Sequence, residues 1–267
     1  MGKNVVPLRE SQSRSAEEVR QERKVAVALG YRLFGALRWG DMGDGHISAR
    51  DPEQHDCFWM LRYGVSYHKA RVSELVLVGP DGRVAEGEGP INRAAYYIHH
   101  PILMARPDAV SAAHVHTPWG TPFAAEVRPI EPISQESCVF FEDHAIFDDE
   151  EVQIQDTDGG RRIAAAMGSN RAVILRNHGL LTATDSVAET VGLFVEMERV
   201  AEVHMKARHA KPISAEAARY AKNEATRMKK ESERNFVAKS KMKERTAAAL
   251  GASRRPVRPV RCGVPRR

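Results

Sequence analysis

Two short apolar segments, one that contains histidines and one that is followed by a histidine, constrain the fold of this chain most strongly. The first, Ala109 to Thr117, contains the sequence His114-Val115-His116. The second, Ala172 to Leu175, is followed at once by Arg176-Asn177-His178-Gly179. Each has the length of a buried strand. Residues i and i+2 of a strand point to one face, so the two imidazoles of the first segment project together, roughly 7 Å apart at Cα. The sequence therefore predicts a sheet whose strand ends hold functional loops in place.

Together the two segments offer three neutral imidazoles, those of His114, His116 and His178. A His-x-His pair alone fits a hydrogen-bonded residue at a strand end as well as it fits a pair of ligands. The third imidazole favours a metal, because three protein ligands and an open position make up a catalytic metal site. Imidazole nitrogen suits both Fe2+ and Zn2+.

Helical and strand-sized segments alternate along the rest of the chain. Ser15 and Glu18 form a capping-box pattern at the start of the first helix, and Pro101 is expected to kink a later helix or open its second half. Several strands are short and joined by turns, which predicts a layered α/β domain. The predicted helices are Ala16 to about Trp39, Asn92 to Ala105, a segment that includes Ile163 to Met167, and Ser186 to Arg208; the other predicted strands are His46 to Arg50, Phe58 to Met60 and Glu74 to Val78.

The charge of the chain is distributed unevenly over its 267 residues. Residues 211–267 hold 17 Lys and Arg against 5 acidic residues, whereas residues 1–210 hold 23 against 30. The basic pI therefore belongs to the tail, and nucleic-acid binding is expected only as non-specific contact by it. We predict a flexible leader over 1–15, a catalytic domain over 16–210, a basic helical extension over 211–250 and a disordered Arg/Pro tail over 251–267.

Composition excludes several other classes of protein. No apolar run approaches the ~20 residues of a membrane span, and Met1 to Arg23 has no signal-peptide pattern. The three cysteines are widely separated, which favours a reducing compartment and predicts a cytoplasmic protein. The chain has no Cys-x-x-Cys, Walker or dinucleotide-binding motif, so thiol redox and nucleotide chemistry have no support.

Four motifs of the chain resemble the class II aldolase/adducin family over roughly residues 20–208. They are Gly45-His46-Ile47-Ser48-Ala49-Arg50, His99 upstream of Arg106-Pro107-Asp108-Ala109, His114-Val115-His116-Thr117, and Leu175-Arg176-Asn177-His178-Gly179-Leu180. The resemblance implies a three-layer α/β/α sandwich with a mostly antiparallel central sheet. It also implies a homotetramer with active sites between subunits, and one divalent metal per subunit bound by the three histidines of the last two motifs.

The chain departs from the sugar-phosphate aldolases of that family at their acid/base residue. Those enzymes carry a Glu where this chain has Ala95, and two phosphate-binding Ser where it has Arg93 and Ala94. Aldol cleavage needs a base within reach of the reacting proton, and alanine cannot supply one. Glu86 or Glu88 could replace it only if the motifs align with a gap.

A subgroup of the family is more similar to this chain. It shares the stretch Gly45 to Pro52, the pair Phe58-Trp59, Asn92 with Ala94-Ala95, and Glu142-Asp143-His144. The subgroup includes decarboxylases of aromatic acids and non-haem iron oxygenases of aminocoumarin antibiotic pathways. Those oxygenases convert a prenylated 4-hydroxyphenylpyruvate to a prenylated 4-hydroxybenzoate.

The resemblance implies a metal-dependent enzyme that cleaves a carbon–carbon bond of a small aromatic oxo acid or carboxylate, with O2 if the metal is Fe2+. Fe2+ is the preferred metal and Zn2+ the alternative. A Zn2+-dependent aldolase or decarboxylase is the second reading. A non-catalytic adducin-like interaction module is the third, and the intact histidine set argues against it.

Further side chains are candidates for the site. His46 stands where aldolases of the family have a substrate-facing Asn, and His144 is a candidate proton shuttle, although Glu142-Asp143-His144 also fits a surface turn. His99 and His100 fit a buried, hydrogen-bonded pair, and His204 and His209 fit a helix surface. The expected substrate-binding residues are Gly45, Ser48, Asn92 and Asn177.

Overall fold

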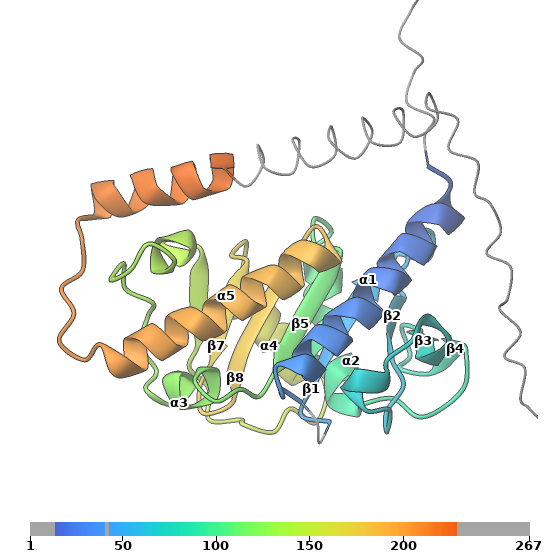
Figure 1. Ribbon diagram of the computed structural model, residues 1–267. Coiled ribbons are helices and arrows are strands. Elements are labelled where there is room, and N and C mark those ends of the chain that lie inside the picture. Colours follow the sequence, from blue (N-terminus) through green and yellow to red (C-terminus); the bar gives the residue numbers. More distant parts are fainter. Residues whose placement is uncertain (1–13, 41–42, 229–267) are drawn as a thin grey trace, which may run out of the picture. The chain divides into compact units, whose positions relative to one another are not determined.

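The computed structural model describes residues 14–40 and 43–228, and an eight-stranded sheet forms its centre (Figure 1). The strand order is β4-β3-β2-β1-β5-β8-β7-β6. All neighbouring strands are antiparallel except β6 and β7, so the predicted mostly antiparallel sheet is confirmed. The strands are β1 Gly45–Arg50, β2 Phe58–Leu61, β3 Leu75–Val78, β4 Val84–Glu86, β5 Ser111–Val115, β6 His144–Phe147, β7 Ala172–Leu175 and β8 Gly179–Thr184.

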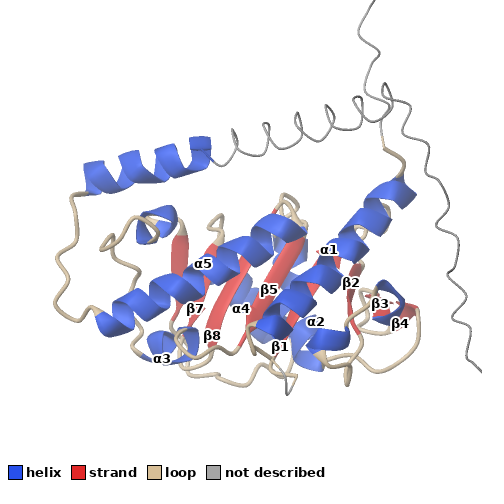
Figure 2. Cartoon of the chain, in the orientation of Figure 1, coloured by secondary structure: helices blue, strands red, loops and turns tan. Residues whose placement is uncertain are grey.

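Helices cover both faces of the sheet, which gives the predicted three layers (Figure 2). One core lies between the sheet and helices α1 and α5, and the other between the sheet and helices α2 and α4. Side chains along β2 alternate between the two cores. Trp59 and Leu61 belong to the first core, and Phe58 and Met60 belong to the second. The helices are α1 Ala16–Ala36, α2 Arg93–Ala105, α3 Gly120–Ala125, α4 Thr157–Met167 and α5 Val187–Lys206, and short 3-10 turns span Tyr67–Lys69, Val72–Glu74 and Ser137–Phe140.

The start of α1 has the predicted capping box. The Ser15 hydroxyl accepts a hydrogen bond from the Glu18 N–H at 3.2 Å, and the Glu18 carboxylate accepts one from the Ser15 N–H at 2.7 Å. The two bonds satisfy backbone donors that a helix start leaves without partners. α1 ends at Ala36, three residues before the predicted end.

Helix α2 runs on to Ala105, so the expectation that Pro101 opens its second half is wrong. Proline has no N–H, which leaves the carbonyl of Tyr97, four residues earlier, without its helical donor. A Cβ atom on Gly160 of α4 would lie 1.9 Å from that carbonyl oxygen. The close approach of α4 at Gly160 therefore covers α2 at the turn that Pro101 weakens.

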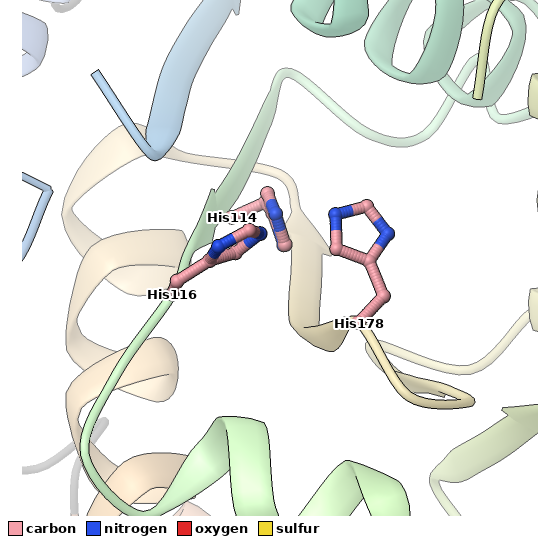
Figure 3. A group of neighbouring side chains, drawn as sticks. All are labelled: His114, His116 and His178. Carbon is pink, nitrogen blue, oxygen red and sulfur yellow. The ribbon is translucent and has the colours of Figure 1, made fainter. Parts of the chain in front are cut away.

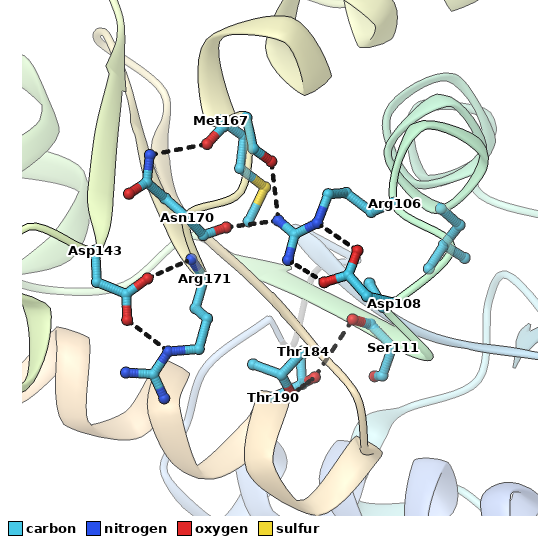
Figure 4. A network of polar contacts seen from close by, with 12 residues as sticks. Arg106, Asp108, Ser111, Asp143, Met167, Asn170, Arg171, Thr184 and Thr190 are labelled. Atoms are coloured by element: carbon cyan, nitrogen blue, oxygen red, sulfur yellow. Dashed lines mark hydrogen bonds and ion pairs between the residues drawn. The ribbon is translucent and has the colours of Figure 1, made fainter. Parts of the chain in front are cut away.

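Two arginines hold the turns that lead into β7 (Figure 4). Arg106, at the end of α2, binds Asp108 and donates to the carbonyl oxygens of Gly168 at 3.0 Å and Asn170 at 2.7 Å. Arg171 donates to Asp143 through its backbone N–H at 3.0 Å and its Nε–H at 2.6 Å. These contacts fix the start of the strand whose other end leads to His178.

Contacts divide the chain into the units Met1–Lys222 and Asn223–Arg267. In the first unit, a helix that begins at residue 215 buries Ala218, and Arg219 pairs with Glu142 at 2.6 Å. Residues 1–13 of the leader predicted over 1–15, residues 229–250 of the extension predicted over 211–250, and all of the tail predicted over 251–267 lie outside the described residues. No helix within 14–40 or 43–228 is long and apolar enough to cross a membrane.

Candidate metal site

Three histidines from two neighbouring strands converge at one end of the sheet (Figure 3). His114 lies on β5, His116 follows the end of β5, and His178 lies in the turn between β7 and β8. One ring nitrogen from each lies within 4.8 Å of those of the others. The turn is tight, because the His178 N–H donates to the Leu175 carbonyl at 3.0 Å and Asn177 has a φ of 54°. The structure thus brings together the three predicted metal ligands.

The protonation of His114 fits metal binding. Its Nδ1 lies 2.8 Å from the carbonyl oxygen of Leu180. A carbonyl can only accept, so Nδ1 carries the proton and the lone pair of Nε2 is free for a ligand bond. Burial holds the pKa of His114 well below its usual range and lowers the pKa of His178 to about 4. Neutral imidazole is the form that binds metals, so the donor set fits a divalent cation.

Exposure changes across the cluster. His114 is buried, His178 is half-buried and His116 is exposed. The cluster therefore has a protein side and an open side. A site with three protein ligands and access on one face is suited to a ligand that exchanges.

Beside the cluster, hydrogen bonds join two residues of β1 to His99 of α2. His46 on β1 pairs in register with His114 on β5, and their ring centroids lie 5.1 Å apart. His46 Nδ1 lies 2.8 Å from Nε2 of His99, and His99 Nδ1 lies 2.7 Å from the Ser48 hydroxyl. Burial lowers the pKa of His99 to about 3. Sequence reasoning gave His99 as a buried, bonded residue, which is confirmed, but missed that it supports His46.

The companion of His99 differs from that expectation. His100 is half-buried and stacks on Tyr96, with ring centroids 5.3 Å apart, and its Nε2 has no hydrogen-bond partner among residues 14–40 and 43–228. The sequence contains a pattern that indicates the hydrogen bonds of His99. His46 and Ser48 are residues i and i+2 of a strand and so share a face, and both contact His99.

The expected substrate-binding residues lie in different surroundings. Gly45 and Asn92 line one hollow with Tyr63, while Asn177 is exposed in the β7–β8 turn and Ser48 is fully buried. A Cβ on Gly45 would lie 2.6 Å from the His114 carbonyl oxygen, so this glycine permits the close contact of β1 and β5. The side chain of Asn92 caps α2 and donates to the Gly43 carbonyl at 3.2 Å.

His144 is not placed at the cluster. It lies beside Ala172 at the start of β7, which runs parallel to β6, whereas His178 follows the other end of β7. Its Nδ1–H donates to the Phe140 carbonyl at 2.7 Å, and its Nε2 accepts from the Ile130 N–H at 3.0 Å. Both ring nitrogens are thus engaged by the backbone of the chain.

His204 was expected at the surface of the long helix, which is wrong. The residue is 1% exposed, its Nδ1–H donates to the Val200 carbonyl at 2.9 Å, and its Nε2 accepts from the Glu131 N–H at 3.0 Å. The segment around Glu131, 73 residues earlier in the sequence, covers the ring of His204. His209 is exposed, as expected, but it lies beyond the end of α5 at Lys206.

The two glutamates that could replace the missing base lie at or just beyond the edge strand of the sheet. Ala95 is fully buried in α2. Glu86 is exposed on β4, the edge strand that β3 and β2 separate from β1, and Glu88 is exposed just beyond it. Arg93, where the aldolases have a phosphate-binding Ser, donates instead to the Gly82 carbonyl at 2.9 Å.

Comparisons with known proteins agree with the fold and the motifs. Residues 25–205 match the family described as Class II Aldolase and Adducin N-terminal domain. The chain is 34% identical over 201 residues to 4-hydroxy-3-prenylphenylpyruvate oxygenase/4-hydroxy-3-prenylbenzoate synthase of Streptomyces roseochromogenus subsp. oscitans, and the match covers 73% of each chain. It is 35% identical over 201 residues to decarboxylase NovR of Streptomyces niveus, which covers 73% of this chain and 74% of that one.

A solved structure is also similar. The L-fuculose 1-phosphate aldolase from Glaciozyma antarctica PI12 superposes with a TM-score of 0.71 at 28% identity, over 81% of this chain and 86% of that chain.

Proposed function

The chain belongs to the class II aldolase and adducin family, and from this premise we propose that it is a non-haem Fe2+ oxygenase that decarboxylates an aromatic oxo acid. The substrate class is a 4-hydroxyphenylpyruvate, with or without a prenyl group, and the product is the corresponding 4-hydroxybenzoate. The product has two carbons fewer than the substrate, so the overall conversion consumes two O2 and releases two CO2 and one water. The observation that carries the proposal is the set of three converging imidazoles in a chain that has the buried Ala95 where the aldolases have their base. The name of the relative from S. roseochromogenus supports the substrate class.

His114, His116 and His178 would hold the metal. A divalent metal bound there would polarise an oxo acid and, as Fe2+, activate O2. The exposure of the cluster on one side suits this chemistry, since the buried His114 would hold the ion while the exposed side would admit substrate.

His46 would orient the substrate. If the Ser48 hydroxyl donates to His99 Nδ1, then His99 Nε2–H donates to His46 Nδ1, and His46 Nε2–H is left to donate to a substrate oxygen. Burial holds the pKa of His46 well below its usual range, so it acts as a neutral donor. The hollow between Gly45, Tyr63 and Asn92 begins one residue away along β1.

A Zn2+-dependent lyase is the second candidate. Three imidazoles are a usual ligand set of catalytic zinc, and the solved L-fuculose 1-phosphate aldolase has the same fold. The buried Ala95 and the engaged Arg93 favour the oxygenase over aldol cleavage of a sugar phosphate.

Reconstitution under anaerobic conditions tests the proposal. The metal-free protein is loaded with Fe2+ or with Zn2+, and 4-hydroxyphenylpyruvate and its 3-prenyl derivative are added with and without O2. We expect O2 uptake, CO2 release and a benzoate product from the Fe2+ form alone. Carbon–carbon cleavage by the Zn2+ form without O2 would overturn the oxygenase in favour of the lyase. A loaded protein that turns over neither compound would reject the substrate class.

The role of His46 is tested by the variant His46→Gln. Its ring donor is lost while the three metal-binding histidines remain, so we expect unchanged metal content and a loss of turnover of at least tenfold. The exposed His209→Gln is the matched control and should retain both. Full turnover by His46→Gln would exclude His46 as the substrate-orienting donor.

A further inference from the structure

A buried carboxylate holds the turn that follows His116. Glu198 lies on α5 and is 3% exposed. Its Oε1 accepts from the Trp119 N–H at 2.9 Å, and its Oε2 accepts from the Gly120 N–H at 2.6 Å and the Thr117 hydroxyl at 2.5 Å. Burial raises the pKa of Glu198, whereas the bonds from Thr117, Trp119 and Gly120 oppose this shift. Three donors on one side chain favour the ionised carboxylate, because that group only accepts.

His116 needs such support more than His114 does. β5 ends at Val115, and the last sheet contact of this segment is the bond from the His116 N–H to the Asp44 carbonyl at 2.8 Å. The His116 side chain is exposed, and its ring contacts those of the other two histidines of the cluster. By contrast, the Leu180 carbonyl orients the ring of His114.

The turn Thr117–Gly120 is also tightly packed. A Cβ atom on Gly120 would lie 2.5 Å from the Thr117 hydroxyl oxygen, 2.7 Å from Leu180 Cδ1 and 2.9 Å from Glu198 Oε2. Helix α3 begins here without a cap from its own N-cap side chain, and Glu198 accepts from its first backbone donors instead. Loss of the acceptor would leave these donors unpaired next to the site.

We propose that Glu198 is a positioning residue of the metal site, which fixes the turn Thr117–Gly120 and thereby aims His116 at the metal. The inference rests on the proposed metal-dependent function. Groups that orient metal ligands from outside the ligand shell typically contribute about 10–100-fold to metal affinity. Glu198 acts on the backbone that carries the ligand rather than on its ring.

The test compares Glu198→Gln with Glu202→Gln. Glutamine keeps the size of Glu198 but turns an N–H group toward donors, whereas Glu202 lies four residues further along α5, where it pairs with Lys206 and is 39% exposed. Zn2+ affinity is measured by competition with a chromophoric chelator. We expect Glu198→Gln to bind Zn2+ about 10–100-fold more weakly than wild type and Glu202→Gln to match wild type.

A double-mutant cycle separates positioning from general loss of stability. If Glu198 acts through His116, then Glu198→Gln should cause no further loss of Zn2+ affinity beyond twofold in a His116→Ala background. A loss as large as in the wild-type background would overturn the proposal. So would equal Zn2+ affinity of Glu198→Gln and wild type.

Two further results show whether a failed test rejects the proposed function or only the role of Glu198. Failure of wild type to bind any divalent metal would reject the proposed function itself, and this inference with it. If Glu198→Gln does not fold, Thr117→Val removes only the hydroxyl donor, and we expect a several-fold loss of Zn2+ affinity. Unchanged affinity of that variant would overturn the positioning role.

Discussion

Nδ1 of His46 lies 2.8 Å from Nε2 of His99, so a fully buried histidine fixes the ring of the one that stands beside the metal cluster. The two residues are 53 positions apart in the sequence. The pair joins the α2 layer to β1 and places two histidines with lowered pKa values in the interior.

The first prediction concerns stability of the metal-free protein at low pH. Burial lowers the pKa of His99 to about 3, whereas a histidine of the unfolded chain titrates near pH 6.5. Between these values the unfolded state binds a proton that the folded state does not, so the free energy of unfolding should fall as the pH is lowered. His99 contributes a slope of about 1.4 kcal/mol per pH unit at most.

Urea unfolding between pH 4 and 7 measures this slope. His99→Gln should have a shallower dependence than wild type, because one titrating group is gone, while the exposed His209→Gln should keep the wild-type slope. An identical pH dependence in His99→Gln and wild type would show that His99 is not held neutral in the folded protein.

The second prediction concerns sugar phosphates. With saturating Zn2+, wild type should show no retro-aldol cleavage of L-fuculose 1-phosphate or ribulose-type phosphates, because Ala95 cannot act as a base and Arg93 is engaged by Gly82. A coupled assay for the released carbonyl product checks this, with an authentic aldolase as the positive control. A robust rate would reverse our interpretation of both positions and implicate Glu86 or Glu88.

The third prediction concerns the contact of α2 with α4. Gly160→Ala would place a Cβ atom 1.9 Å from the Tyr97 carbonyl oxygen, so we expect a loss of about 1–3 kcal/mol in the free energy of unfolding. Gly192→Ala is the matched control in α5, where a Cβ meets nothing within 4 Å. It should raise stability by about 0.5–1 kcal/mol. Equal stabilities of the two variants would contradict this packing.

The fourth prediction concerns residues 251–267, which lie outside the described residues and hold six Arg. Removal of this segment should leave metal content and turnover unchanged. Retention on a polyanion column should fall in a salt-sensitive manner, because the interaction is electrostatic. A truncated protein that loses metal or turnover would show that the tail is part of the catalytic unit.

Local patterns predicted much of the fold. The apolar run Ala172 to Leu175 is a strand with the predicted limits, and the capping box at Ser15 is present. Strand β8, Gly179–Thr184, was missed because it follows the His178 turn directly and contains two threonines in place of a continuous apolar run. The short strands β4 and β6 are only partly buried and carry little hydrophobic signal.

The site was predictable where it depends on strand geometry and less so where it depends on contacts between distant segments. His114 lies on β5, His116 directly follows β5, and His178 follows β7. The bonds of His144 to Ile130 and of His204 to Glu131 depend on how one loop folds over the sheet and α5. Glu198 gave no signal in the sequence, since its partners lie about 80 residues earlier.

Metal content measured after reconstitution tests the central claim most directly. Metal-free wild type and the variants His114→Ala, His116→Ala and His178→Ala are loaded with Fe2+ or Zn2+, freed of unbound metal and analysed by mass spectrometry, with circular dichroism as the check on folding. We predict one metal ion per chain in wild type and loss of most of it in each folded variant, because three ligands are the minimum of a tight catalytic site. Full occupancy in any one of the variants, or none in wild type, would contradict a metal centre built on these three histidines.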